Sequence, residues 1–319
     1  MQRSQRNPIL TRAEIPSLPP HVDVSSVFNP GAIKLGNRYL LLLRVQTRGR
    51  ETRLMLAESA DGERFQVQPR VLEIDGLAKL GMRFHHIYDP RLTRIGDVVY
   101  VTFAADTDDG CRVGVAKTQD FEHLEIVSFS RNVDSRNAVL FPERHRGKYL
   151  RLERPNRTRL ASGVLSGDEI VLSASEDLVD WTVVAPVMAG RPHSWDELIG
   201  SGPPPVKTRA GWLHVYHGVA THFASANIYQ AGVVLLDLQD PSKVIARGRE
   251  NILEPREMYE LVGQVPNVVF PSGLIVEDFD GAGFATADSI VRLYYGAADT
   301  VVCLASTTVA ELIRSCGVT

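Results

Sequence analysis

The feature that most constrains the fold is a pair of apolar β-strand patterns that recurs five times along the 319-residue chain. In each copy, a first strand, mostly led by a glycine, is followed by a variable loop and a second strand that ends in a polar turn. The copies are residues 36–44 with 53–62, 96–103 with 112–121, 147–153 with 169–178, 211–217 with 231–240, and 291–296 with 301–306. Their spacing of roughly 50 to 80 residues is typical of four-stranded propeller blades joined by uneven loops. The repeat therefore predicts an all-β, five-bladed β-propeller.

An irregular β-sandwich is the alternative fold for so many short strands. Radial repetition is favoured because it protects the strand edges that a sandwich of this size would expose. Helical periodicity is convincing only at residues 309–314, which predicts a short C-terminal helix. Because no linker of low complexity interrupts the sequence, residues 1–319 are expected to form a single propeller domain.

Composition excludes several classes of function. A formal net charge of −3 and a pI of about 6.3 do not indicate a basic surface that would bind nucleic acid. The chain has no apolar run of the length that a membrane span needs, about 18 residues, and its first residues are polar, unlike a signal peptide. The three cysteines lack metal-ligand spacing and are expected to be reduced thiols in a cytoplasm. No metal site is predicted.

Asp89 lies at the start of the second blade, just before a run that is expected to form a buried strand. Pro90 fixes its own φ and biases Asp89 away from the α region, so the carboxylate is presented on a stiff, extended turn. Arg91 is not expected to neutralise Asp89, because neighbours in an extended chain point to opposite sides. Taken alone, Asp89 and Pro90 fit an ordinary turn.

Cationic side chains recur at the starts of blades and at the ends of their first strands. Singly, each arginine fits a salt bridge or a stem that lies along the core. Together they predict an anion pocket opposite Asp89, and the planar fork of arginine suits two oxygens of a phosphate. The cations are Arg136, Arg154, Lys207 and His217.

Short motifs spread over residues 29–305 resemble glycoside hydrolase family 130, the β-mannoside phosphorylases and a few related hydrolases. The motifs lie at residues 29–32, 89–91, 137–142, 202–208, 216–218, 229–238, 266–271 and 295–299. They occur in the order and at the spacing of that family, whose members are five-bladed propellers. The resemblance thus implies the same fold as the repeat.

The resemblance also implies a reaction and a set of site residues. Asp89 is implied to be the general acid of an inverting phosphorolysis, protonating the leaving oxygen through the 3-hydroxyl of mannose. Arg136, Arg154, Lys207 and His217 fall where the family's phosphate ligands lie. Residues that hold the mannose and the catalytic carboxylate are implied at Asn29, Arg44, Asn137, Tyr229 and Asp299. Inorganic phosphate is the co-substrate, and no other cofactor is expected.

Two positions depart from the family pattern. The usual Lys-Asp pair is Arg136-Asn137 here, which keeps a cation but removes an anion that would contact sugar hydroxyls. The usual histidine before Arg154 is Glu153, and strand alternation predicts that Glu153 points away from the phosphate pocket. His217 is expected to make phosphate affinity depend on pH, since only protonated imidazole donates from both nitrogens.

Two other functions remain open at this stage. A hydrolase of the same fold would use water instead of phosphate and would lose the basic cluster. A non-catalytic sugar-binding propeller would favour aromatic platforms, yet the chain has only three tryptophans. The expected substrates are a mannobiose, a mannooligosaccharide or mannosyl-N-acetylglucosamine, with the β-1,4 or β-1,2 linkage left open. The oligomeric state, a homo-oligomer included, is also left open.

Overall fold

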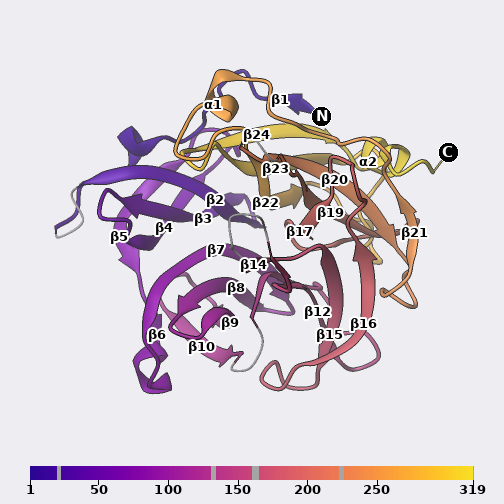
Figure 1. The fold of residues 1–319 in the computed structure, drawn as a ribbon, viewed down its shortest axis with the longest axis horizontal. Coiled ribbons are helices and arrows are strands. Elements are labelled where there is room, and N and C mark those ends of the chain that lie inside the picture. Colours follow the sequence, from indigo (N-terminus) through magenta and orange to yellow (C-terminus); the bar gives the residue numbers. More distant parts are fainter. Residues whose placement is uncertain (20–22, 131–133, 160–164, 223–225, 319) are drawn as a thin grey trace.

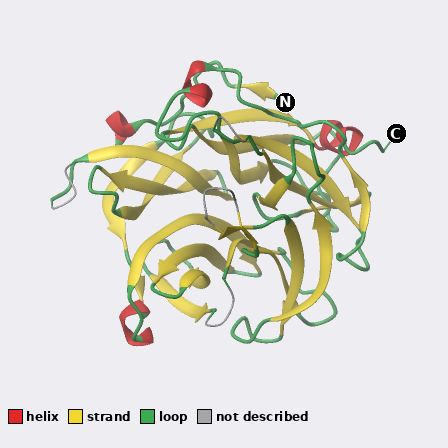
Figure 2. Ribbon diagram, viewed as in Figure 1, coloured by secondary structure: helices red, strands yellow, loops and turns green. Residues whose placement is uncertain are grey.

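Five antiparallel sheets lie around a common centre in the computed structural model, which describes residues 1–19, 23–130, 134–159, 165–222 and 226–318 (Figure 1). The predicted five-bladed β-propeller is confirmed, and the two strands of each sequence repeat are the central strands of each blade. Figure 2 shows that strands dominate the molecule and that the short helices lie at its periphery.

Each blade is built from consecutive strands, with the first strand innermost. Blade one comprises β2 (Val24–Leu35), β3 (Arg38–Thr47), β4 (Thr52–Ser59) and β5 (Gln66–Leu72). Blade two comprises β7 (Phe84–Ile95), β8 (Val98–Thr107), β9 (Gly110–Thr118) and β10 (Leu124–Phe129), with β6 (Ile74–Asp75) beside β10. Blade three comprises β11 (Ser135–Leu140), β12 (Tyr149–Pro155), β15 (Glu169–Ser175) and β16 (Thr182–Ala189).

The fourth blade has a divided inner strand, β17 (Leu198–Ser201) and β18 (Val206–Thr208), followed by β19 (Gly211–Ala220), β20 (Ile228–Leu236) and β21 (Val244–Arg247). Blade five comprises β22 (Val269–Val276), β23 (Ile290–Ala297) and β24 (Val301–Thr308). A small hairpin of β13 (Thr158–Arg159) and β14 (Leu165–Ser166) extends from blade three. The remaining elements are 3-10 turns at Arg12–Glu14 and Leu77–Leu80, and helices α1 (Met258–Leu261) and α2 (Val309–Ser315).

The N-terminal segment completes the last blade. Strand β1 (Gln2–Arg3) pairs with the outer edge of β24, so the ring is closed by residues from both ends of the chain (Figure 1). Arg3 Nε donates to Glu260 Oε1 of α1 at 2.8 Å, and the Tyr295 hydroxyl donates to the same oxygen. Burial alone would raise the pKa of Glu260, but these hydrogen bonds hold it below its usual range. The closure therefore depends on an ionised carboxylate in the interior.

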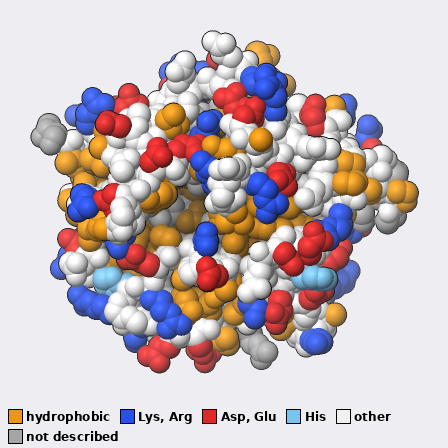
Figure 3. Space-filling model, turned by 180° about the vertical axis from the view of Figure 1, so that it is seen from behind, with side chains coloured by type: hydrophobic (Ala, Val, Ile, Leu, Met, Phe, Trp, Pro, Cys, Tyr) orange, Lys and Arg blue, Asp and Glu red, His pale blue; other side chains and the backbone are white. Residues whose placement is uncertain are grey.

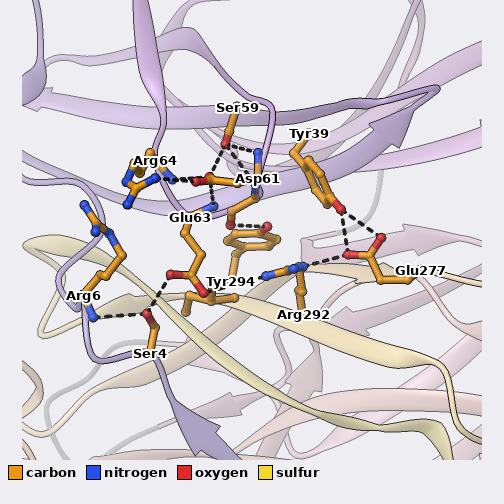
Figure 4. Close-up of polar contacts among 12 residues, drawn as sticks. Ser4, Arg6, Tyr39, Ser59, Asp61, Glu63, Arg64, Glu277, Arg292 and Tyr294 are labelled. Carbon is orange, nitrogen blue, oxygen red and sulfur yellow. Dashed lines mark hydrogen bonds and ion pairs between the residues drawn. The ribbon is translucent and has the colours of Figure 1, made fainter.

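A polar network joins blade one to blade five (Figure 4). Glu277 accepts from the Tyr39 hydroxyl at 2.9 Å and from Arg292 Nε at 2.7 Å, and it also pairs with Lys34. The buried Tyr294 hydroxyl donates to the backbone oxygen of Gly62 at 2.8 Å. Blades one and five therefore contact each other through directed polar bonds as well as through packing.

The predicted C-terminal helix is α2, which begins at Val309. Thr308 caps it, because the Thr308 hydroxyl accepts a hydrogen bond from the backbone amide of Glu311. Its buried Val309 and Leu312 pack in one apolar cluster with Val233 of β20 and Val291 of β23. Helix α2 thus fills the groove between blades four and five. Among the described residues, no helix is long and apolar enough to cross a membrane.

Candidate active site

A cavity of about 470 Å³ opens at one mouth of the central channel. Its lining includes residues from every blade, because the inner strands converge there. The structure brings nine of the ten predicted site residues to this cavity: Asn29, Arg44, Asp89, Arg136, Asn137, Arg154, His217, Tyr229 and Asp299.

A repeated β-bulge carries three of these side chains. In blades one, two and three, the inner strand has two residues opposite one on its partner, with register shifts at Phe28/Gly31, Tyr88/Arg91 and Arg136/Val139. The first residue of each bulge has a positive φ: 47° at Asn29, 53° at Asp89 and 55° at Asn137. Asn and Asp tolerate this left-handed region better than other residues with side chains. The bulge re-aims one side chain per blade at the channel, and all three line the cavity.

Arg44 is the direct partner of Asp89. Its Nη1 donates to Asp89 Oδ1 at 2.9 Å, and Asn29 Nδ2 donates to the same oxygen at 2.9 Å. The Arg44 guanidinium lies between the rings of Phe28 and Tyr88, 4.3 and 4.8 Å from their centroids. Burial by itself raises the pKa of Asp89, but the charges of Arg44 and Arg91 with the bond from Asn29 hold it below its usual range.

Arg91 lies deeper in the channel and is almost completely buried. Its Nε donates to the backbone oxygen of Gly202 at 2.8 Å, and its Nη1 donates to the backbone oxygen of Asp89 at 2.9 Å. Arg91 makes no hydrogen bond to the Asp89 carboxylate within the described structure, but its charge still helps to lower the pKa of Asp89, so the expectation that Arg91 does not neutralise Asp89 is wrong. It links the inner strands of blades two and four beneath the cavity.

Arg136 and Arg154 are directly opposite each other on the antiparallel pair β11 and β12. Like charges at such cross-strand positions destabilise a sheet. The Nε atoms of both are buried, and neither has a hydrogen-bond partner among the described residues. Arg154 Nη2 donates to Asn156 Oδ1 at 2.9 Å, which orients its guanidinium. Burial and the charge of Arg136 lower the pKa of Arg154 to about 10, so it stays cationic at neutral pH.

His217 lines the same cavity, with its ring centroid 4.7 Å from that of Phe270. Gly200 is opposite it, and a Cβ at Gly200 would lie 2.5 Å from His217 Cε1 and 2.5 Å from Asn137 Nδ2. Burial, followed by the charges of Arg154 and Arg91, lowers the pKa of His217 well below 6.5. These effects favour the neutral imidazole and oppose the charge change near neutral pH that the sequence led us to expect.

Lys207 is the predicted site residue that the structure does not bring to this cavity. Lys207 is opposite Trp212 on β19, whereas the cavity is at the level of His217 on the same strand. Trp212 and His217 are about 17 Å apart along an antiparallel strand. Lys207 Nζ pairs instead with Glu143 at 2.7 Å, in a hollow lined by residues from the far ends of the inner strands. Figure 3 shows this opposite face, where hydrophobic side chains gather around a central hollow. The prediction that Lys207 joins the anion pocket is corrected accordingly.

Glu153 points away from the cavity, as alternation predicts. Its carboxylate accepts from Arg151 Nη2 at 3.0 and 3.1 Å and from the Ser135 hydroxyl at 3.2 Å. Burial raises the pKa of Glu153, but Arg151 and the serine hydroxyls outweigh it and hold the pKa low. Glu153 therefore does not compete with an anion for Arg154.

Asp299 is another carboxylate that lines the cavity with Asp89. Burial raises its pKa to about 6; Arg44 opposes that shift and the charge of Asp89 adds to it. An ionised Asp299 in turn favours the protonated form of Asp89, since like charges raise each other's pKa. Of Asp89 and Asp299, Asp299 is thus the carboxyl whose charge changes closer to neutral pH.

Because the family resemblance implies that Asp299 holds the sugar, we expect kcat/KM to fall as the pH drops through about 6, where protonated Asp299 would accept fewer hydrogen bonds from hydroxyl groups. The Asp299→Asn protein should lack this ionisation, so its kcat/KM should be low and should change less as the pH drops through about 6. The measurement is the pH profile of kcat/KM for both proteins. An unchanged acid limb in the variant would contradict the assignment.

Several lining residues were not predicted from the sequence. They include polar groups near the mouth of the cavity: Gln46, Arg50, His86, Asp106 and Gln264. Gln46 could have been found, since it lies two residues after Arg44 on the same face of β3. Arg50 and Gln264 lie in connections between strands, where periodicity gives no signal.

A propeller that places two partly buried carboxylates in one cavity with arginines whose Nε donors are unpartnered among the described residues has the features of a glycoside-cleaving enzyme. The chain belongs to glycoside hydrolase family 130: the family model, described as beta-1,4-mannooligosaccharide phosphorylase, matches residues 1–317.

Relatives with established names are similar over most of the chain. A 1,2-beta-oligomannan phosphorylase of Thermoanaerobacter sp. is 32% identical, covering 87% of this chain and 88% of its own length. The beta-1,4-mannooligosaccharide phosphorylase of Ruminococcus albus is 31% identical, with 98% of this chain and 89% of its own length covered. Among solved structures, the beta-1,2-mannobiose phosphorylase of Listeria innocua in complex with beta-1,2-mannobiose superposes with a TM-score of 0.84 at 26% identity. That superposition covers 100% of this chain and 99% of the Listeria chain.

Proposed function

We propose that the protein catalyses inverting phosphorolysis of a β-mannoside, releasing α-mannose 1-phosphate and the shortened acceptor sugar. The observation that carries the proposal is the cross-strand pair Arg136 and Arg154, which lines the same cavity as Asp89. The buried Nε donors of both arginines have no hydrogen-bond partner in the described structure. A bound phosphate would relieve the repulsion between the two guanidinium groups and accept their hydrogen bonds. The names of the relatives support the same reaction.

In the proposed reaction, a phosphate oxygen forms a bond to the anomeric carbon as the bond to the acceptor oxygen breaks. A proton from Asp89 passes through the 3-hydroxyl of mannose to the leaving oxygen. Asp89 must be protonated for this step, and the negative charges of phosphate and Asp299 both raise its pKa. Arg44 and Asn29 hold the carboxyl in place. Burial and the charges of Arg154 and Arg91 keep His217 neutral before phosphate binds, and the negative charge of a bound phosphate would oppose that effect.

An inverting hydrolase is the alternative, with Asp299 as the base that activates water. A family-130 structure whose title refers to hydrolases of beta-1,2-mannosidic linkages has a TM-score of 0.80 at 22% identity, a likeness of fold alone. The phosphorylase is favoured because a hydrolase has no use for the paired arginines.

We further propose that the whole chain acts as one catalytic domain in the cytoplasm, where millimolar phosphate is available. No metal or organic cofactor is needed, since phosphate is itself the nucleophile. The residues near the mouth, Gln46, Arg50, His86 and Gln264, would contact the acceptor sugar and decide between β-1,4- and β-1,2-linked substrates.

The test is to supply β-1,4- and β-1,2-mannobiose with and without inorganic phosphate and to identify the products. The expected product is α-mannose 1-phosphate, formed only when phosphate is present. Free mannose formed at a rate independent of phosphate would identify a hydrolase instead.

A further inference from the structure

A second cavity, of about 540 Å³, lies between blades two and three, apart from the site described above. One wall is the outer strand of blade two, with Val127, Ser128 and Phe129 of β10. The other is a face of blade three, where Arg151, Ser173 and Val183 are partners in one row across β12, β15 and β16. Its volume falls within the range of small-molecule sites, roughly 300–1,000 Å³.

The polar group at the centre of this wall is a buried ion pair. The side chains of Arg151 and Glu153 are 3% and 5% exposed, and Arg151 Nη2 donates to both carboxylate oxygens of Glu153. The Arg151 guanidinium stacks on the indole of Trp181, 4.1 Å from the ring centroid. These contacts hold Arg151 in one orientation.

The Arg151 Nε atom is buried and has no hydrogen-bond partner in the described part of the chain. Buried donors are normally paired, because an unpaired one costs about 1–3 kcal/mol. Arg151 lines the cavity, so a ligand there could accept this hydrogen bond. The free donor is the observation that points to a bound molecule.

The lining indicates the class of that molecule. Glu153 neutralises Arg151 and Asp180 adds another negative charge, so the cavity does not favour an anion. Ser130 supplies a hydroxyl, while Trp181, Val179 and Val183 supply apolar surface. Alternating hydroxyl and C–H surfaces, which such a lining complements, are characteristic of a neutral sugar.

We propose that the cavity between blades two and three is a second saccharide-binding site, which holds a neutral oligosaccharide against Arg151, Glu153 and Trp181. The site is separate from the cavity at the channel mouth and does not depend on the reaction proposed there. It would retain a chain of a polysaccharide on the propeller without cleaving it.

Two exposed valines on β16 provide a matched pair of variants. Val183 lines the cavity and is 46% exposed, whereas its neighbour Val184 is 55% exposed and is not among the residues lining it. Val183→Arg fills the cavity, and Val184→Arg places the same side chain on the other face of the strand. Val179→Arg, in the turn before β16, is a second filling variant at a 52% exposed residue.

The measurement is calorimetric titration of the full chain with β-1,4- and β-1,2-mannotriose in the absence of phosphate. Wild type and Val184→Arg should share a binding component that is at least tenfold weaker in Val183→Arg and in Val179→Arg. The filled variants should keep the wild-type melting temperature and turnover. A hexuronic acid oligosaccharide of equal length should bind this component at least tenfold more weakly than mannotriose.

The proposal is overturned if no saccharide component responds to the filling variants, or if the uronic acid binds equally well. Loss of the component in Val184→Arg as well would indicate a nonspecific effect of charge and would also overturn it. Because the titration contains no phosphate, its outcome is separate from that of the phosphorolysis assay. A chain without phosphorylase activity could still have this site, and the reverse also holds.

Discussion

The Asp89→Asn protein is expected to lose phosphorolysis by a factor of about 10² to 10⁴ on a natural disaccharide, because it lacks the proton donor. The fold should persist, since Asn tolerates the left-handed φ of 53° at this bulge and can still accept from Asn29. The measurement is the rate of mannose 1-phosphate formation from mannobiose at saturating phosphate. A rate above a tenth of wild type would exclude Asp89 as the general acid.

A matched control is Asp97→Asn in the turn that follows β7, where the side chain is 98% exposed. Its activity should equal that of the wild type. Melting temperatures of the two variants separate loss of chemistry from loss of folding. An aryl mannoside with a good leaving group should recover part of the Asp89→Asn deficit, because its departure needs less protonation.

Arg154→Ala is expected to raise the apparent KM for phosphate about tenfold or more. Each charge-assisted hydrogen bond to phosphate contributes roughly 1.5–3 kcal/mol, and 1.4 kcal/mol corresponds to a factor of ten. The KM for the disaccharide should change far less, because other residues hold the sugar. The experiment is a phosphate titration at fixed disaccharide, followed by a disaccharide titration at saturating phosphate.

Lys207→Ala provides the control for this second experiment. It removes a cation that the sequence assigned to the phosphate pocket but that the structure pairs with Glu143 elsewhere. The apparent KM of Lys207→Ala for phosphate should equal that of the wild type. An effect of Lys207→Ala as large as that of Arg154→Ala would contradict the placement of the anion pocket between β11 and β12.

The sequence by itself predicted the features that depend on short stretches of chain. Apolar strand pairs led by turn-forming glycines have a local period, so the number of blades could be counted before any contact was known. Asn29, Asp89 and Asn137 belong to short motifs of the same kind, and three equivalent bulges now explain why those residue types recur. The outward direction of Glu153 also followed from the period of two in a strand.

Tertiary structure decided what depends on neighbours from other blades. Lys207 and His217 lie in one blade and one short stretch, yet the register along β19 puts them at opposite ends of the channel. The neutral state of His217 is set by burial and by Arg154 and Arg91, which come from two other blades. The completion of blade five by β1 joins residues about 300 positions apart. Burial, register and charge environment arise only when distant segments pack together, and no local pattern encodes them.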